Sequence, residues 1–397
     1  MPQLGIVTFH SSFNEGAILQ ALALATHLSR LLPDWKVDIV DLYYASKQEV
    51  YERAMTERER TIQDFSRRRL PLSAERYVIG RSHQQPLASL GERYQALVYG
   101  SDEVWKLRYR RRLLGFGKVA QSDPFFPAFP NAYWPDPSLK IPRFAYAVCV
   151  GETRPHLVPG EHRAIMRDSI ASLSLIGVRD TETKRFVEWL DPANAARVQH
   201  VPDPTFSVSL VDESHLESAR LKLTAWGVDF SRPTVVVLCR YGRLIQPALQ
   251  RLRSRGYQSV GLVLKNGCVD LDLSGKPLTP LEWMAAFRLF DLCISERMHA
   301  CISCLLQGTP VIALDFLKDR DHQGSKIENL FDTFGLAAFH YSVHFQEAQE
   351  LGRMCERIEA GEWPHAHVKR TTETLRVRSI EFAGQLCEML SPAVRPQ

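Results

Sequence analysis

Three ionisable side chains stand within four residues of one another in the stretch CISERMHACISCLLQGTPVIAL. Glu296, Arg297 and His299 lie between two apolar runs, where such residues are unusual unless they bind something. An arginine can bind a carboxylate or a phosphate through two parallel hydrogen bonds. A histidine can give or take a proton near neutral pH. The group therefore predicts an anion site that carries out acid–base chemistry.

The elements around these residues predict where they lie. Residues 291–295 have the pattern of a buried strand, residues 297–307 that of a helix that ends at Gly308, and residues 310–314 that of the following strand. Parallel sheets bind ligands at the carboxyl ends of their strands, and a helix N-terminus attracts anions. The alternative is structural: Glu296 and Arg297 form an ion pair, and His299 caps the helix.

The rest of the chain reads as two series of strands that alternate with helices, which predicts parallel sheets. Residues 46–90 are charged and have a helical pattern. We predict an α/β fold with two Rossmann-like domains facing a cleft, formed by residues 1–210 and 211–370, and a C-terminal helix, residues 371–397, that crosses back to the first domain. The expected strands cover residues 4–9, 36–43, 94–100, 143–150, 175–180 and 198–206 in the first domain, and 233–242, 257–265, 291–295 and 310–314 in the second.

The chain has 397 residues, of which 45% are hydrophobic, and a net charge of +4. This composition is typical of a globular protein. This mild excess of positive charge fits an anionic ligand or a membrane surface and does not require nucleic acid. No apolar run reaches the roughly 20 residues of a membrane span. Eight cysteines lie mostly in apolar runs, which is typical of a reduced, cytoplasmic protein. The pair Cys301 and Cys304 lacks the partners of a zinc site, so we expect no metal.

Other polar residues are expected at strand ends of the first domain. His10, Ser11 and Asn14 follow the first strand, and Asp102 and Trp105 follow the third. Carboxylates, amides and an aromatic face are the groups that bind sugars. Asp102 is either a base for an attacking hydroxyl or the cap of a following helix. The proline-rich stretch 122–142, which includes Phe125, Phe126, Tyr133 and Trp134, is expected to be an irregular loop and a possible lid.

Five motifs in one order carry a resemblance to a known family. They are GIVTFHSSFNEGAILQALAL, VYGSDEVWK, IGVRDTETKRFVE, VPDPTF and ISERMHACISCLLQGTPVIAL. Together they resemble the polysaccharide pyruvyl transferase family over nearly the whole chain. Glu296, Met298 and Glu103 depart from the aspartate, leucine and glutamine that are usual there. The third departure points to a different acceptor or to a subfamily with altered chemistry.

The resemblance implies transfer of a pyruvyl group from phosphoenolpyruvate to two hydroxyls of a saccharide, without a cofactor, on a fold like that of glycosyltransferases of the B type. It assigns Arg179, Arg297 and Lys326 to the anionic donor, with Glu296 beside them, and His299 as the general acid. It leaves open which saccharide is the acceptor and whether it is lipid-linked, which would bring the protein to the inner face of a membrane.

Two other functions fit the same architecture. A glycosyltransferase would use the helix N-terminus for the diphosphate of a nucleotide sugar. A non-catalytic binding protein would keep the fold and lose the charged residues, which are all present here.

Overall fold

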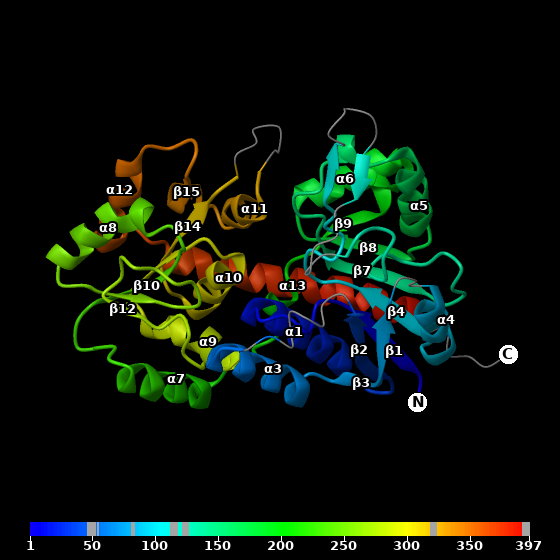
Figure 1. Ribbon diagram of the computed structural model, residues 1–397, viewed down its shortest axis with the longest axis horizontal. Coiled ribbons are helices and arrows are strands. Elements are labelled where there is room, and N and C mark those ends of the chain that lie inside the picture. The colour runs from blue at the N-terminus through cyan, green and yellow to red at the C-terminus, as the bar shows by residue number, and fades with distance from the viewer. Residues whose placement is uncertain are drawn as a thin grey trace.

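The structure is a computed structural model that describes residues 1–45, 53, 55–80, 84–111, 118–120, 127–317 and 324–390. Its strands form two large parallel sheets, one beside the other, with helices packed around each (Figure 1). Both faces of the sheets are buried, as β10 (Thr234–Leu238) shows, because its alternate valines belong to two separate apolar clusters. The predicted α/β fold with two parallel sheets is confirmed.

The first sheet has seven strands in the order β3-β2-β1-β4-β7-β8-β9. Their bounds are β1 (Gln3–Val7), β2 (Lys36–Tyr44), β3 (Leu72–Ile79), β4 (Ala96–Tyr99), β7 (Arg143–Val148), β8 (Leu175–Val178) and β9 (Val198–His200). A short antiparallel pair, β5 (Tyr109–Arg111) and β6 (Lys118–Ala120), stands apart from it. The helices of this half are α1 (Glu15–Leu31), α3 (Glu57–Arg69), α4 (Gln84–Arg93), α5 (Gly160–Ala171) and α6 (Thr181–Leu190).

The second sheet has six strands in the order β12-β11-β10-β13-β14-β15. The strands other than β10 are β11 (Gln258–Gly261), β12 (Leu271–Asp272), β13 (Leu292–Ser295), β14 (Val311–Asp315) and β15 (His340–Ser342). The helices that follow in the chain are α7 (Glu213–Ala225), α8 (Gly242–Ser254), α9 (Pro280–Ala286), α10 (Met298–Gln307), α11 (Lys326–Thr333), α12 (Ala348–Glu359) and α13 (His365–Leu390).

The strand β3 corrects the expectation that residues 46–90 are helical. It lies at the edge of the first sheet and pairs with β2. Half of its residues, including Glu75 and Arg76, are exposed, while Ser73, Tyr77 and Ile79 are buried. A charged, exposed edge strand resembles a solvated helix in composition. For this reason, the sequence did not reveal the strand.

The last helix, α13, runs from the second half of the molecule to the first (Figure 1). Near its start, His367 lies 3.0 Å from the carbonyl of Phe334. Farther along, the ring of Phe382 meets the edge of Tyr146 in β7, and Gln385 accepts a hydrogen bond from Gln199 in β9 at 2.8 Å. The helix therefore ties the two sheets together on one side of the molecule.

The proline-rich loop does not form a lid over the part that the structure describes, residues 127–142. Phe129, Tyr133 and Trp134 are buried in the core of the first half. Phe125 and Phe126 lie outside the described residues. The expectation of exposed aromatic rings on this segment is wrong for Tyr133 and Trp134, because Tyr133 stacks on Tyr44 of β2 and Trp134 stacks on Trp105.

Among the helices that the structure describes, none is long and apolar enough to cross a bilayer. All eight cysteines are free thiols, and Cys301 and Cys304 are buried on α10 as part of the core.

Candidate active site

Two adjoining cavities lie where the carboxyl ends of the two sheets face each other. The first, of about 480 Å³, is lined by the turn after β1, by Asp102 and by the start of α10, and we call it the His299 cavity. The second, of about 530 Å³, lies beside the starts of α6, α8 and α11, and we call it the Tyr241 cavity. Four charged residues line both of them: Glu103, Arg240, Glu296 and Lys326.

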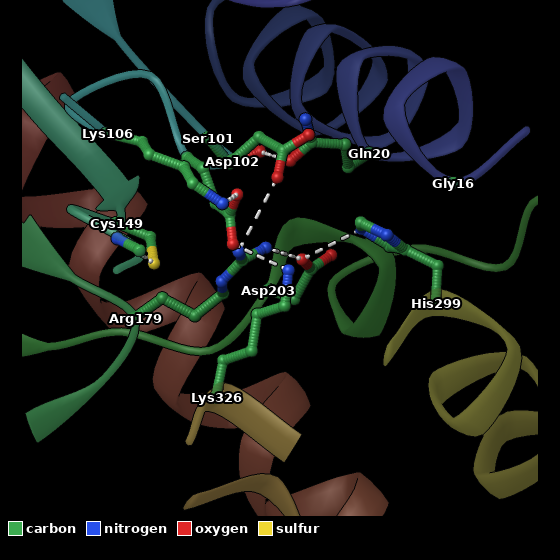
Figure 2. Close-up of polar contacts among 12 residues, drawn as sticks. Gly16, Gln20, Ser101, Asp102, Lys106, Cys149, Arg179, Asp203, His299 and Lys326 are labelled. Carbon is green, nitrogen blue, oxygen red and sulfur yellow. Dashed lines mark hydrogen bonds and ion pairs between the residues drawn. The ribbon is translucent and has the colours of Figure 1, made fainter. Parts of the chain in front are cut away.

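His299 lies in the first turn of α10 and packs against the first turn of α1, which belongs to the other sheet (Figure 2). A Cβ atom on Gly16 would lie 2.3 Å from Cγ of His299, a separation that side chains do not tolerate. Glycine is therefore required at this position for the imidazole to reach its place. The histidine of one half and the helix of the other half are in direct contact.

A buried carboxylate, Asp203, lies between Arg179 and His299 at the centre of the site (Figure 2). Its Oδ2 accepts a hydrogen bond from Nη1 of Arg179 at 2.8 Å and lies 3.5 Å from Nε2 of His299. Burial raises the pKa of Asp203, but the interactions with His299, Arg179 and Thr205 outweigh it and hold the pKa well below its usual range. Asp203 therefore stays charged and orients the imidazole ring.

Arg297 precedes α10 and reaches across to α1. Its Nη2 donates a hydrogen bond to Oδ1 of Asn14 at 2.8 Å, and the same oxygen caps α1 by accepting from the amide of Gly16 at 3.1 Å. Desolvation lowers the pKa of the Arg297 guanidinium, which nevertheless keeps its charge because arginine titrates far above neutral pH. The side chain lines the His299 cavity and has donors beyond the one that Asn14 uses.

Glu296 pairs with Arg240 and not with Arg297. Nε of Arg240 donates to Oε1 of Glu296 at 2.8 Å, across the ends of β10 and β13. The alternative of a Glu296–Arg297 ion pair is therefore wrong. Glu296 fixes Arg240 at the junction of the two cavities, and its own negative charge makes it a poor direct ligand for an anionic donor.

Lys326 forms a third contact between the two halves. Its ammonium group lies 2.6 Å from Oε1 of Glu103, whose second oxygen lies 3.0 Å from the ammonium group of Lys106. Desolvation lowers the pKa of Lys326, but the charge of Glu103 has the larger net effect and raises it. Burial raises the pKa of Glu103, and its two lysines bring it well below the usual range. Glutamate at position 103 thus forms a charged bridge that a glutamine would not supply.

Arg179 lies behind the His299 cavity and does not line it. The residue is 5% exposed, and its other terminal nitrogen, Nη2, lies 3.5 Å from Oδ1 of Asp102. Two carboxylates thus compensate its charge, and the surrounding acids raise the pKa of the guanidinium against desolvation. The expected set of four cationic groups around one anion is therefore divided: Arg297, His299 and Lys326 line the cavity, and Arg179 holds Asp102 and Asp203 in place.

Asp102 lines the His299 cavity from the first sheet. Its backbone has φ 82°, in the left-handed region, and its carbonyl accepts a hydrogen bond from the amide of Cys149 at 2.9 Å. The residues that follow form a turn, so Asp102 caps no helix and that alternative is wrong. A strained backbone that aims a carboxylate into a cavity is common at functional sites.

The remaining predicted residues differ in whether their side chains are available to a ligand in the His299 cavity. Ser11 and Asn14 line the His299 cavity. His10 also lines it, but its ring nitrogens are engaged by the carbonyl of Thr8 at 3.2 Å and by Asp41 at 3.0 Å. Trp105 is fully buried, donates to the carbonyl of Tyr133 and stacks on Trp134, so it cannot serve as an aromatic platform for a sugar. It completes the core beneath the cavity.

Asp203 and Arg240 belong to the site, although no pattern in the sequence predicted them there. Asp203 belongs to the motif VPDPTF, which signalled its importance but not its role. Its position between Arg179 and His299 depends on contacts between distant parts of the chain. Arg240 follows a buried strand, as Glu296 does. This shared position could have predicted that the two side chains lie close together.

The fold and the site define a class of protein with two Rossmann-like halves and a charged cleft, a glycosyltransferase-B-like fold. UDP-GlcNAc 2-epimerase from Neisseria meningitidis, in its complex with UDP-GlcNAc, shares this fold with a TM-score of 0.56 and 11% identity, over 99% of this chain and 100% of the epimerase. HepE of Anabaena, in complex with UDP and glucose, has a TM-score of 0.55 and 11% identity over 99% of this chain and 100% of its own. These likenesses concern the fold.

Residues 14–316 match the polysaccharide pyruvyl transferase family, and the chain belongs to that family. A putative UDP-N-acetylglucosamine 2-epimerase from Listeria monocytogenes is also similar in structure, with a TM-score of 0.55 and 9% identity over 98% of this chain and 96% of its own. No curated protein matches the sequence.

The contact between Gly16 and His299 can be tested through stability. Alanine usually stabilises a helix relative to glycine by about 0.5–1 kcal/mol. We expect Gly16→Ala to destabilise the protein instead, by about 1–3 kcal/mol, because the new methyl group overlaps the imidazole. Gly352→Ala in α12 is the matched control, because a Cβ there meets nothing within 4 Å. Chemical denaturation of both variants measures the difference, and equal gains in stability would contradict the contact.

Proposed function

We propose that this protein transfers a pyruvyl group from phosphoenolpyruvate to two hydroxyls of a saccharide and forms a ketal. The family supports pyruvyl transfer to a polysaccharide. The observation that carries the finer assignment is the convergence of Arg297, His299 and Lys326 on one cavity. A carboxylate and a phosphate on a small molecule need several cationic groups within reach, and this cavity provides them.

The donor is proposed to bind in the His299 cavity against the start of α10. The first amides of the helix and Arg297 supply hydrogen-bond donors for one anionic group. Lys326 lies on the opposite side, held by Glu103 so that its charge is compensated until an anion arrives. Residues 211–370 would thus carry the donor side, and residues 1–210 the acceptor side, with Ser11 and Asn14 at the end of β1.

The chemistry begins with addition to the carbon–carbon double bond of the donor. A saccharide oxygen attacks the carbon that bears the phosphate, and His299 gives a proton to the neighbouring methylene carbon, which becomes a methyl group. The second hydroxyl then displaces the phosphate at the same carbon: the new carbon–oxygen bond forms, the bond to phosphate breaks, and the hydroxyl proton leaves with the phosphate. Asp203 supports the proton donor, because its carboxylate lies 3.5 Å from Nε2 and holds the imidazole ring in position.

The base for the attacking hydroxyl is proposed to be Asp102. Its carboxylate faces the same cavity as His299 and comes from the other sheet. Arg179 lies 3.5 Å from it and forms no close hydrogen bond, so a saccharide hydroxyl can reach the carboxylate oxygens. If the acceptor is lipid-linked, the exposed arginines at the end of α3, residues 67–69, provide a basic segment for an anionic membrane surface.

The test is incubation of the purified protein with phosphoenolpyruvate and a panel of saccharides. We expect a product heavier by one pyruvyl ketal, together with released phosphate in equal amount. A parallel set with nucleotide sugars examines glycosyl transfer. Glycosyl transfer without phosphate release from phosphoenolpyruvate would overturn the proposal and favour the glycosyltransferase.

Replacement of Arg297 tests the donor site. Arg297→Ala should weaken phosphoenolpyruvate binding by about 2–4 kcal/mol, the range for a buried contact between charged groups. Arg297→Lys keeps the charge without the planar fork and should have a smaller effect. Arg353→Ala, an exposed arginine on α12, is the control. Calorimetric titration measures the affinities, and unchanged binding by Arg297→Ala would exclude Arg297 as a donor ligand.

Replacement of Asp102 tests the base. Asparagine tolerates a left-handed backbone as aspartate does, so Asp102→Asn should fold normally. We expect phosphoenolpyruvate to bind as in the wild type, while turnover falls about 10²-fold or more. Asp229→Asn at an exposed turn is the control. Normal turnover in Asp102→Asn would direct the search for the base to His10 and its partner Asp41.

A further inference from the structure

The Tyr241 cavity is the feature that the proposed reaction leaves unused. It continues from the His299 cavity past the four charged residues that both share, and its volume of about 530 Å³ lies within the range of small-molecule sites. It is lined by the starts of α6, α8 and α11, which come from both sheets. A molecule bound at His299 can therefore extend into it.

The charges of this cavity argue against a phosphate-bearing ligand. Six carboxylates line it against four cationic side chains. Three of the cations are already compensated, because Arg240 pairs with Glu296, and Lys106 and Lys326 share Glu103. A diphosphate would meet more negative than positive charge here. A neutral molecule with many hydroxyl groups would meet acceptors for its hydrogen bonds.

An aromatic surface lies beside these carboxylates. The side chain of Tyr241, at the start of α8, is 52% exposed, and its ring centroid lies 4.7 Å from that of Phe316. Packing against Phe316 holds the Tyr241 ring in place while part of it stays open to the cavity. A fixed, exposed aromatic ring provides a flat surface against which the apolar face of a sugar ring can pack.

Asp180 supplies the polar counterpart. The residue is 4% exposed, and its Oδ1 caps α6 by accepting hydrogen bonds from the amide and the hydroxyl of Thr183, both at 2.7 Å. Its Oδ2 has no hydrogen-bond partner among the described residues, although a buried carboxylate oxygen is costly to leave unsatisfied. Because Asp180 lines the Tyr241 cavity, a ligand hydroxyl placed against this wall is a suitable partner for the carboxylate.

We propose that the Tyr241 cavity binds the sugar residue next to the one that is pyruvylated, so that the acceptor is an oligosaccharide of at least two units. This inference rests on the proposed function for the identity of the reacting sugar. The neighbouring sugar stacks on Tyr241 and donates a hydroxyl hydrogen bond to Asp180. The reacting sugar then lies at the junction, within reach of Asp102 and His299.

Binding without the donor tests this site separately from the reaction. The probes are gluco- and galacto-configured oligosaccharides of one to four units and UDP, titrated into the full chain and followed by calorimetry and ligand-observed NMR. We expect affinity to rise from one unit to two and to change little beyond that. Tyr241→Ala should weaken binding of the disaccharides and longer probes about tenfold, and Tyr241→Phe should retain it. Phe345→Ala, an exposed aromatic residue that lines neither cavity, is the control.

Three results would overturn the inference: equal binding of one and two units, undiminished binding by Tyr241→Ala, or binding of UDP in place of every oligosaccharide. Failure of pyruvyl transfer with all acceptors, in the presence of Tyr241-dependent oligosaccharide binding, would overturn the proposed function and leave a saccharide site. Pyruvyl transfer to single sugars, with no gain in affinity from a second unit, would support the proposed function and overturn the inference about the Tyr241 cavity.

Discussion

The burial of one carboxylate constrains the centre of this protein. The side chain of Asp203 is 1% exposed, and a buried ion without partners would be severely destabilising. Arg179, His299 and Thr205 compensate it, and they come from the end of β8, the start of α10 and the turn after β9. The geometry of all three segments is tied to this charge. Arg179 in turn fixes Asp102, so the carboxylate orients both residues that we assign to proton transfer.

The two halves of the molecule meet through side chains at the cleft. Arg297 contacts Asn14, His299 contacts Gly16, and Lys326 contacts Glu103, each pair joining one half to the other. These contacts are polar or tightly packed, and each involves a residue near a strand end or the first turn of a helix. The cleft is thus preorganised by the same side chains that face a ligand. In the proposed complex, the donor would use the Arg297 donors that Asn14 leaves available and would share Lys326 with Glu103, with the Asp203 network in place.

The sequence predicted the buried strands well, because runs such as β10, β13 and β14 are continuous, apolar and bounded by turn residues. It also predicted that Glu296, Arg297 and His299 follow a strand. It failed at β3, whose exposed charges conceal an edge strand. It also failed at Trp105 and the proline-rich loop, where aromatic residues were expected to meet sugar.

The errors at the site have a common physical reason. Residue type and spacing predict which side chains lie near a strand end, but not which of several partners each one takes. Glu296 lies beside Arg297 in the sequence and pairs with Arg240, 56 positions away. The sequence likewise did not show that Arg179, which is predicted to bind the donor, pairs with Asp102 and Asp203. Such choices depend on the packing of distant segments, which a single sequence does not display.

The path of the chain between its two halves limits how they can move. The chain crosses once after β9, through the 3₁₀ turn η4 (Pro204–Phe206), and again through α13, which contacts that turn. Because the two connections lie side by side, they restrict rotation of one half relative to the other about a line near η4 less than they restrict sliding or twisting. Contacts far from this line open most in such a rotation. The cleft could then admit an acceptor chain from the side, without threading its end.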